Sequence, residues 1–120
     1  EARAAGLDFE ITTHLLDEHD RAIADGEAHG CIRLITPRGS DRILGATIVA
    51  THAGDTIAEF VLAMRHGLGL RKILATVHIY PTLAEANKAA AGAWQSRHLP
   101  GRLLQLAGYL NRRRLGSNRA

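Results

Sequence analysis

Two runs of β-branched residues on either side of a short turn constrain the fold more than any other feature of this chain. The runs lie within "GCIRLITPRGSDRILGATIVAT" and flank residues 37–41, which contain Pro, Gly, Ser and Asp. Val, Ile and Thr favour extended backbone, and such a turn cluster between two extended runs is typical of an antiparallel hairpin. Gly45 inside the second run indicates a bulge or a close backbone approach.

The order of the other elements predicts an α+β fold. Residues 7–15 alternate with a period of two and predict a strand, and residues 17–26 predict a short helix that stops at Gly26. After the hairpin only helical patterns follow, so we expect an antiparallel sheet with helices packed on one side. The first helix spans residues 52–67 and ends at Gly67. Its apolar positions at helical spacing are Ile57, Phe60, Val61 and Met64.

The segment "LRKILATVHIYPTLAEANKAAAGAW" predicts a short helix, an extended stretch and a longer helix. Tyr80 should be extended because the ring of Pro81 excludes the α region for the residue before it. Thr82 and Glu85 have the spacing of a capping box, which predicts that the longer helix starts at Thr82. Its expected buried residues are Leu83, Ala86, Ala90 and either Ala93 or Trp94. Pro100 fits the first turn of a last helix with an apolar stripe at Leu103, Leu106, Ala107 and Leu110.

Charge divides the chain into an acidic body and a basic tail. Residues 1–85 carry 8 Lys/Arg and 12 Asp/Glu, whereas residues 86–120 carry 7 Lys/Arg and no acid. Clustered cations can bind phosphates, so one candidate function is a stand-alone, non-enzymatic module that binds nucleic acid or anionic lipid through this tail. The predicted arginines lie on a solvent-facing side of a helix and only Tyr109 offers a stacking ring. A nucleic-acid partner is therefore disfavoured, and a membrane partner stays open.

Other compositional features exclude several classes. A chain of 120 residues fits about one domain, and no apolar run approaches the roughly 20 residues that cross a bilayer. Cys31 is the only cysteine, which indicates a small buried residue at a strand start and a reducing compartment such as the cytoplasm. No two of the seven histidines have His-x-x-x-His spacing, so we expect no metal site.

Three pieces of the sequence together resemble the C-terminal dimerisation domain of FAD-dependent pyridine nucleotide-disulfide oxidoreductases. They are "DRILGATIV", "HAGDTIAEFVLAM" and "HIYPTLAEANK", and the last matches the family's His-Pro-Thr-x-x-Glu segment except at one position. The resemblance implies a dimerisation domain at residues 7–95, followed by an extra basic amphipathic helix and tail at 96–120. It also implies that FAD and NAD(P)H are bound by N-terminal domains absent from this segment, so that the segment alone binds neither cofactor and is inactive.

In that family the Pro-Thr loop reaches into the partner subunit's active site, which implies a homodimer. The residues carried over are catalytic Tyr80 and Glu85, with Tyr80 and Pro81 beside the cofactor. Tyr80 replaces the family's acid–base histidine. The pKa of histidine is about 6.5 and that of tyrosine is about 10, so Tyr80 is a poor proton shuttle near neutral pH. In an extended segment the side chains of His78 and Tyr80 share one face, so His78 is a candidate replacement.

Structural explanations stay open for each of these residues. Tyr80 fits a half-buried interface aromatic, and His78 fits an ordinary packing residue. Glu85 fits a helix cap alone or a cap with an added functional hydrogen bond. The chain ends in "RRRLGSNRA" without the cysteine pair of mercuric-reductase-like members, which argues against a mercury substrate.

Overall fold

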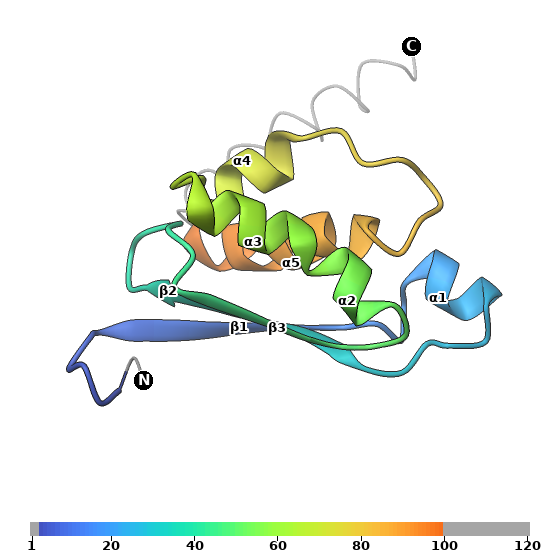
Figure 1. The fold of residues 1–120 in the computed structure, drawn as a ribbon, viewed down its shortest axis with the longest axis horizontal. Coiled ribbons are helices and arrows are strands. Elements are labelled where there is room, and N and C mark those ends of the chain that lie inside the picture. The colour runs from blue at the N-terminus through green and yellow to red at the C-terminus, as the bar shows by residue number, and fades with distance from the viewer. Residues whose placement is uncertain (1–2, 100–120) are drawn as a thin grey trace, which may run out of the picture.

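The computed structural model describes residues 3–99, and its centre is a three-stranded antiparallel sheet in the order β1-β2-β3. The strands are β1 (Phe9–Leu15), β2 (Cys31–Pro37) and β3 (Gly45–Val49). The helices are α1 (Asp20–Ala24), α2 (Ala53–Thr56), α3 (Ala58–Arg65), α4 (Leu70–Ala75) and α5 (Glu85–His98). Figure 1 shows α4 and α5 above one face of the sheet, which confirms the predicted α+β class.

The predicted hairpin is formed by β2 and β3, with Ile35 opposite Gly45 and Cys31 opposite Val49. Gly45 marks neither a bulge nor a close approach, because it pairs in register and a Cβ added there would meet only Ile35 at 3.8 Å. The close approach lies at Gly30 instead. Its φ is +114°, and a Cβ there would overlap the Val49 carbonyl oxygen, so this position requires glycine.

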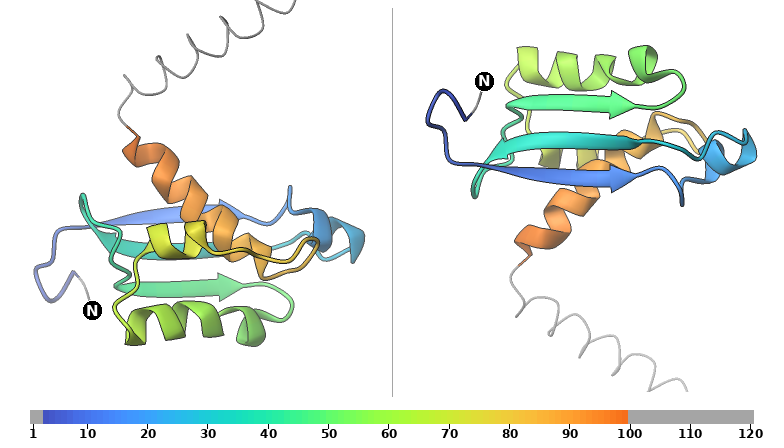
Figure 2. Two further views of the ribbon diagram at one scale, coloured as in Figure 1. Left: turned by 90° about the horizontal axis from the view of Figure 1, so that it is seen from above. Right: turned by 90° about the horizontal axis from the view of Figure 1, so that it is seen from below.

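The core lies between the sheet and α5, which crosses β1 and β2 (Figure 2). Ile32 and Leu34 of β2 contribute to it from the sheet, and Phe60, Leu70 and Trp94 contribute from the helices. The Trp94 indole is anchored by polar contacts, because its Nε1 donates to Thr36 Oγ1 at 3.2 Å and to Glu10 Oε1 at 3.3 Å.

The other face of the sheet is free of helices in the described part of the chain (Figure 2, right). The apolar residues of the alternating 7–15 segment point there, since Ile11 and Leu15 are exposed while Thr12 is buried. Cys31 also lies on this face, opposite Leu15. It stands at the strand start as predicted, but it is half-buried rather than fully buried.

The helical segment 52–67 forms two helices, α2 and α3, that meet at Ile57. Gly67 ends α3 as predicted, with φ +66°, and the Leu68 N–H donates to the Ala63 carbonyl at 2.8 Å. The predicted apolar stripe is only partly buried. Phe60 is fully buried, whereas Val61 and Met64 are exposed.

The predicted capping box at Thr82 is wrong, because α5 begins three residues later, at Glu85. The Thr82 hydroxyl donates to the Ile79 carbonyl at 2.7 Å, and the Thr82 carbonyl accepts from the Glu85 N–H at 3.3 Å. The Thr82 hydroxyl, which would cap the helix in a capping box, therefore forms a hydrogen bond within the loop instead. The buried residues of α5 are Ala86, Asn87, Ala90, Ala91 and Trp94, while Leu83 and Ala93 are only half-buried.

The predicted last helix from Pro100, its apolar stripe and most of the basic tail lie outside the described residues. The candidate binding of nucleic acid or lipid by that tail rests on those positions and stays a prediction. The predicted domain boundary between residues 95 and 96 falls inside α5. Among residues 3–99, none of the helices has the length and apolar character to cross a bilayer.

Candidate functional site

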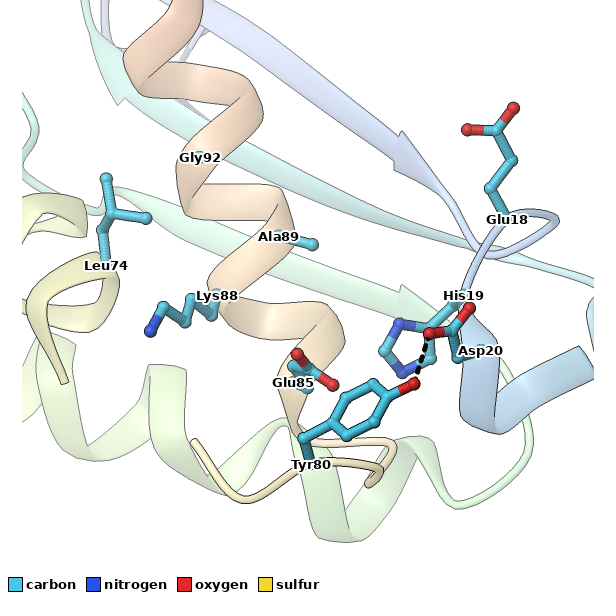
Figure 3. Close-up of a pocket in the computed structure, with 9 residues that line it drawn as sticks. All are labelled: Glu18, His19, Asp20, Leu74, Tyr80, Glu85, Lys88, Ala89 and Gly92. Atoms are coloured by element: carbon cyan, nitrogen blue, oxygen red, sulfur yellow. Dashed lines mark hydrogen bonds between the residues drawn. The ribbon is translucent and has the colours of Figure 1, made fainter. Parts of the chain in front are cut away.

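A groove of about 370 Å³ lies between α1, the loop 76–84 and the first turns of α5 (Figure 3). It brings together residues far apart in the sequence. Its lining residues are Glu18, His19, Asp20, Leu74, Tyr80, Glu85, Lys88, Ala89 and Gly92. The groove contains two of the predicted site residues, Tyr80 and Glu85.

Tyr80 projects from the loop that joins α4 to α5 and has 63% of its surface exposed. Its peptide bond to Pro81 is cis. The phenol Oη donates a 2.7 Å hydrogen bond to Asp20 Oδ2 on α1, the contact drawn in Figure 3. The ring therefore spans the mouth of the groove rather than packing into the core.

The hydrogen bond to Asp20 raises the pKa of Tyr80 above its usual value of 10.0. The negative charge of Asp20 raises this pKa further, and slight desolvation and the charge of Glu85 act in the same direction. The phenol is therefore protonated at neutral pH and acts as a hydrogen-bond donor, as the sequence predicts.

Glu85 is the first residue of α5, and Lys88 lies one turn further along the same wall of the groove. With Glu18 and Asp20 the groove carries three carboxylates and one ammonium group. Pro81, the other predicted cofactor contact, is exposed and outside the groove lining.

Sequence reasoning missed His19 and Asp20, which hold the loop against α1. The His19 ring nitrogen Nε2 lies 3.0 Å from the Thr82 carbonyl oxygen, and His19 is buried. The residue pairs Tyr80–Asp20 and Thr82–His19 are separated by 60 and 63 positions. The polar run at residues 17–20 indicates the start of a helix. It does not indicate that His19 and Asp20 contact the loop that carries Tyr80 and Thr82.

His78 points away from the groove. Its Nε2 lies 3.0 Å from Glu59 Oε1, and its Nδ1 lies 3.1 Å from the Thr76 carbonyl oxygen. The side chain is only 6% exposed, whereas Tyr80 is open to solvent. The two side chains therefore do not share a face as the extended geometry predicted, and the structure groups Tyr80 with Glu85 but not with His78.

The loop and α3 both carry exposed apolar side chains. Val77 and Ile79 are 84% and 71% exposed, and Val61 and Leu62 of α3 are both 59% exposed. A shallow, mainly apolar hollow of about 480 Å³ lies on α3, lined by Gly54, Ile57, Ala58, Val61, Leu62 and Arg65. Contiguous exposed apolar residues of this kind mark contact surfaces.

The groove beside α5 lacks the enclosure that a dinucleotide such as FAD needs. The groove is a surface hollow beside α5, and "HGLGL" at 66–70 follows a helix rather than a strand, so it lacks the context of a phosphate-binding glycine loop. Within residues 3–99, no three His, Cys, Asp or Glu side chains gather in an arrangement that could hold a metal ion.

The sequence of residues 1–91 matches the profile of the dimerisation domain of pyridine nucleotide-disulphide oxidoreductases. The chain belongs to this family. Its members include the mitochondrial dihydrolipoyl dehydrogenase of Dictyostelium discoideum, which is 37% identical over 91 residues, 76% of this chain and 19% of that protein. The dihydrolipoyl dehydrogenase of Vibrio cholerae is 35% identical over 95 residues, 79% of this chain and 20% of that protein.

Solved structures of flavoprotein reductases contain the same fold. The HOCl-induced flavoprotein disulfide reductase RclA of Escherichia coli aligns with a TM-score of 0.71 at 21% identity, over 76% of this chain and 21% of that one. LpdA of Mycobacterium tuberculosis aligns with a TM-score of 0.70 at 20% identity, over 82% of this chain and 21% of that one. The chain thus spans about a fifth of the length of the relatives it matches.

Proposed function

We propose that this dimerisation domain pairs two subunits of a flavin-dependent NAD(P)H oxidoreductase and presents Tyr80 and Glu85 to the flavin site of the partner. The single observation that carries the proposal is the exposure of the loop tip. Tyr80 is 63% exposed and follows Val77 and Ile79, which are more exposed still. A loop that places three large apolar or aromatic side chains in solvent is suited to contact a second surface.

The pairing surface in this proposal is the outer side of α3. Val61 and Leu62 stand on a helix whose opposite side buries Phe60 and Ala63 in the core. In a twofold dimer the same patch meets itself, so one apolar helix face supplies both halves of the contact. The loop 76–84 then extends beside this contact toward the partner.

The chemistry proposed for Tyr80 is donation of a hydrogen bond. FAD and NAD(P)H, held by other domains, would supply the electron transfer. The phenol Oη donates its hydrogen bond to Asp20 in this structure, and it can donate instead to an acceptor in the partner's site. Glu85 adds negative charge to the same groove, which keeps the phenol protonated.

This chemistry favours an electron acceptor that needs a hydrogen-bond donor over one that needs a proton shuttle. Relatives named dihydrolipoyl dehydrogenase act on a dithiol, and dithiol exchange requires repeated proton transfer near neutral pH. Tyr80 with a raised pKa is poorly suited to that step. The lone Cys31 supports a reducing compartment, and we propose a cytoplasmic location.

Sedimentation equilibrium of the chain and of two matched variants tests the pairing surface. Val61 on α3 and Val49 on the open sheet face are 59% and 60% exposed, so an aspartate at either position perturbs the monomer to a similar degree. Val61→Asp should weaken self-association by roughly a hundredfold, because it places an unpaired charge in an apolar contact. Val49→Asp should leave it unchanged. Equal effects of both substitutions, or self-association unchanged by Val61→Asp, would place the contact elsewhere.

A further inference from the structure

Glu59 joins three elements of the fold through its carboxylate. It stands on α3 and binds His78 in the loop, with Nε2 at 3.0 Å from Oε1 and 3.1 Å from Oε2. It also accepts a 2.9 Å hydrogen bond from Nδ2 of Asn87 on α5. The same Asn87 nitrogen donates to the Thr56 carbonyl at 2.8 Å, so both of its protons are directed at α2 and α3.

Asn87 and the His78 ring are buried, while the side chain of Glu59 is 28% exposed. Asn87 is fully buried, and its amide cannot be reversed, because the oxygen would then face the carbonyl of Thr56 and the carboxylate of Glu59. Both ring nitrogens of His78 face acceptors, the Thr76 carbonyl and the Glu59 carboxylate. The His78 ring is therefore held from both sides, by the loop backbone and by Glu59 on α3.

Glu59 and Val61 occupy different sides of α3, whereas Leu62 lies on the same side as Glu59 and lines a common surface hollow with it. Val61 follows Glu59 by two residues, which is about 200° around the helix axis. The proposed pairing surface therefore includes Val61 on one side of α3 and borders, through Leu62, the side on which Glu59 holds the loop two residues before Tyr80. The eight-residue helix α3 connects the two.

We propose that Glu59 is a positioning residue that links pairing through α3 to the placement of the Tyr80 loop. The Glu59–His78–Asn87 cluster fixes the loop relative to the pairing surface, so that dimer formation sets where the Tyr80 phenol lies. His78 in this account orients the loop and moves no proton. The inference rests on the proposed pairing through α3, and its test separates the two.

The test is ¹⁹F NMR of the chain labelled with 3-fluorotyrosine in a Tyr109→Phe background, where Tyr80 is the only tyrosine. Glu59→Gln and His78→Gln should each shift and broaden the Tyr80 resonance, and the double variant should resemble either single one, because both remove the same contact. The control is Glu27→Gln, which alters an exposed carboxylate bound to the Thr51 hydroxyl at 3.0 Å and should leave the resonance in place.

A Tyr80 resonance unchanged in folded Glu59→Gln overturns the inference. If that variant fails to fold, His78→Gln serves in its place, since His78 lies outside the helices and strands. Repeating the spectra in the Val61→Asp background tests the cluster in the monomer, so a failure of pairing is seen separately from a failure of the cluster.

In the full-length protein that carries this chain, Glu59→Gln should lower kcat about tenfold or more with KM for NAD(P)H unchanged, because a displaced site residue loses its alignment. A shifted resonance with unchanged kcat would instead contradict the proposed role of Tyr80.

Discussion

Tyr80 and Asp20 are 60 residues apart in the sequence and share a 2.7 Å hydrogen bond across the mouth of the groove. The contact ties the loop before α5 to α1, the short helix after β1. It also sets the chemistry of the phenol, because a neighbouring carboxylate stabilises the protonated form. Both consequences can be measured.

Asp20→Asn should lower the pKa of Tyr80 toward 10.0, because it removes the anionic acceptor that is the main cause of the rise. Spectrophotometric titration of tyrosinate absorbance in the Tyr109→Phe background reports this pKa directly. With Asp20 present, the raised folded-state pKa means that stability falls as pH rises from the unfolded value through the folded one. If the pKa of Tyr80 is unchanged or higher in Asp20→Asn, the contact between Tyr80 and Asp20 does not form in solution.

Tyr80→His should increase dithiol–disulfide exchange by the full-length protein about tenfold or more, measured with dihydrolipoamide and NAD⁺. Histidine exchanges protons near neutral pH, which Tyr80 with its raised pKa cannot do. Tyr80→Phe is the control, since it lacks both the hydroxyl and a titrating group. Equal rates for the His and Phe variants would mean that the loop does not reach the reacting thiols.

Gly30→Ala should destabilise the fold by at least about 3 kcal/mol, because its φ of +114° is unfavourable for alanine and the added Cβ would overlap the Val49 carbonyl oxygen. Gly26→Ala is the matched control. Its φ is +72°, but a Cβ there meets nothing within 4 Å, so only the backbone term of about 1 to 2 kcal/mol applies. Urea unfolding monitored by Trp94 fluorescence gives both values, and equal losses would contradict the close approach.

His14→Gln should remove part of the loss of stability in mild acid. Burial lowers the pKa of His14 below 6.5, and the nearby His19 lowers it further. A lowered folded-state pKa contributes stability that is present above pH 6.5 and is lost as pH falls through the folded value. Urea midpoints of both proteins between pH 7 and pH 5 should therefore converge as the pH falls. A constant difference would assign the acid sensitivity to other groups.

The sequence predicts the elements that depend on local patterns. The hairpin follows from β-branched runs around residues 37–41, and the end of α3 follows from Gly67. The start of α5 could not be placed, because the Thr82 hydroxyl can either cap the backbone N–H of residue 85 or bind a carbonyl within the loop. In the structure it binds the Ile79 carbonyl. Spacing alone does not decide between such alternatives.

The candidate site was only half predictable for a related reason. Tyr80 and Glu85 lie in one short segment that resembles a family motif, so the sequence identifies them. Their partners Asp20 and His19 come from another element, and no periodicity links positions 60 residues apart. His78 was misplaced because alternation in an extended segment takes no account of Glu59, whose carboxylate draws the ring inward.

Photo-crosslinking from position 80 tests the central claim most directly. With p-benzoylphenylalanine in place of Tyr80 in the full-length protein, irradiation should give a covalent product of twice the subunit mass, linked to residues outside the matching segment 1–91. This result is expected because the Tyr80 side chain is exposed and proposed to enter the partner's flavin site. Products of single-subunit mass only, linked to α1 near Asp20, would contradict the account.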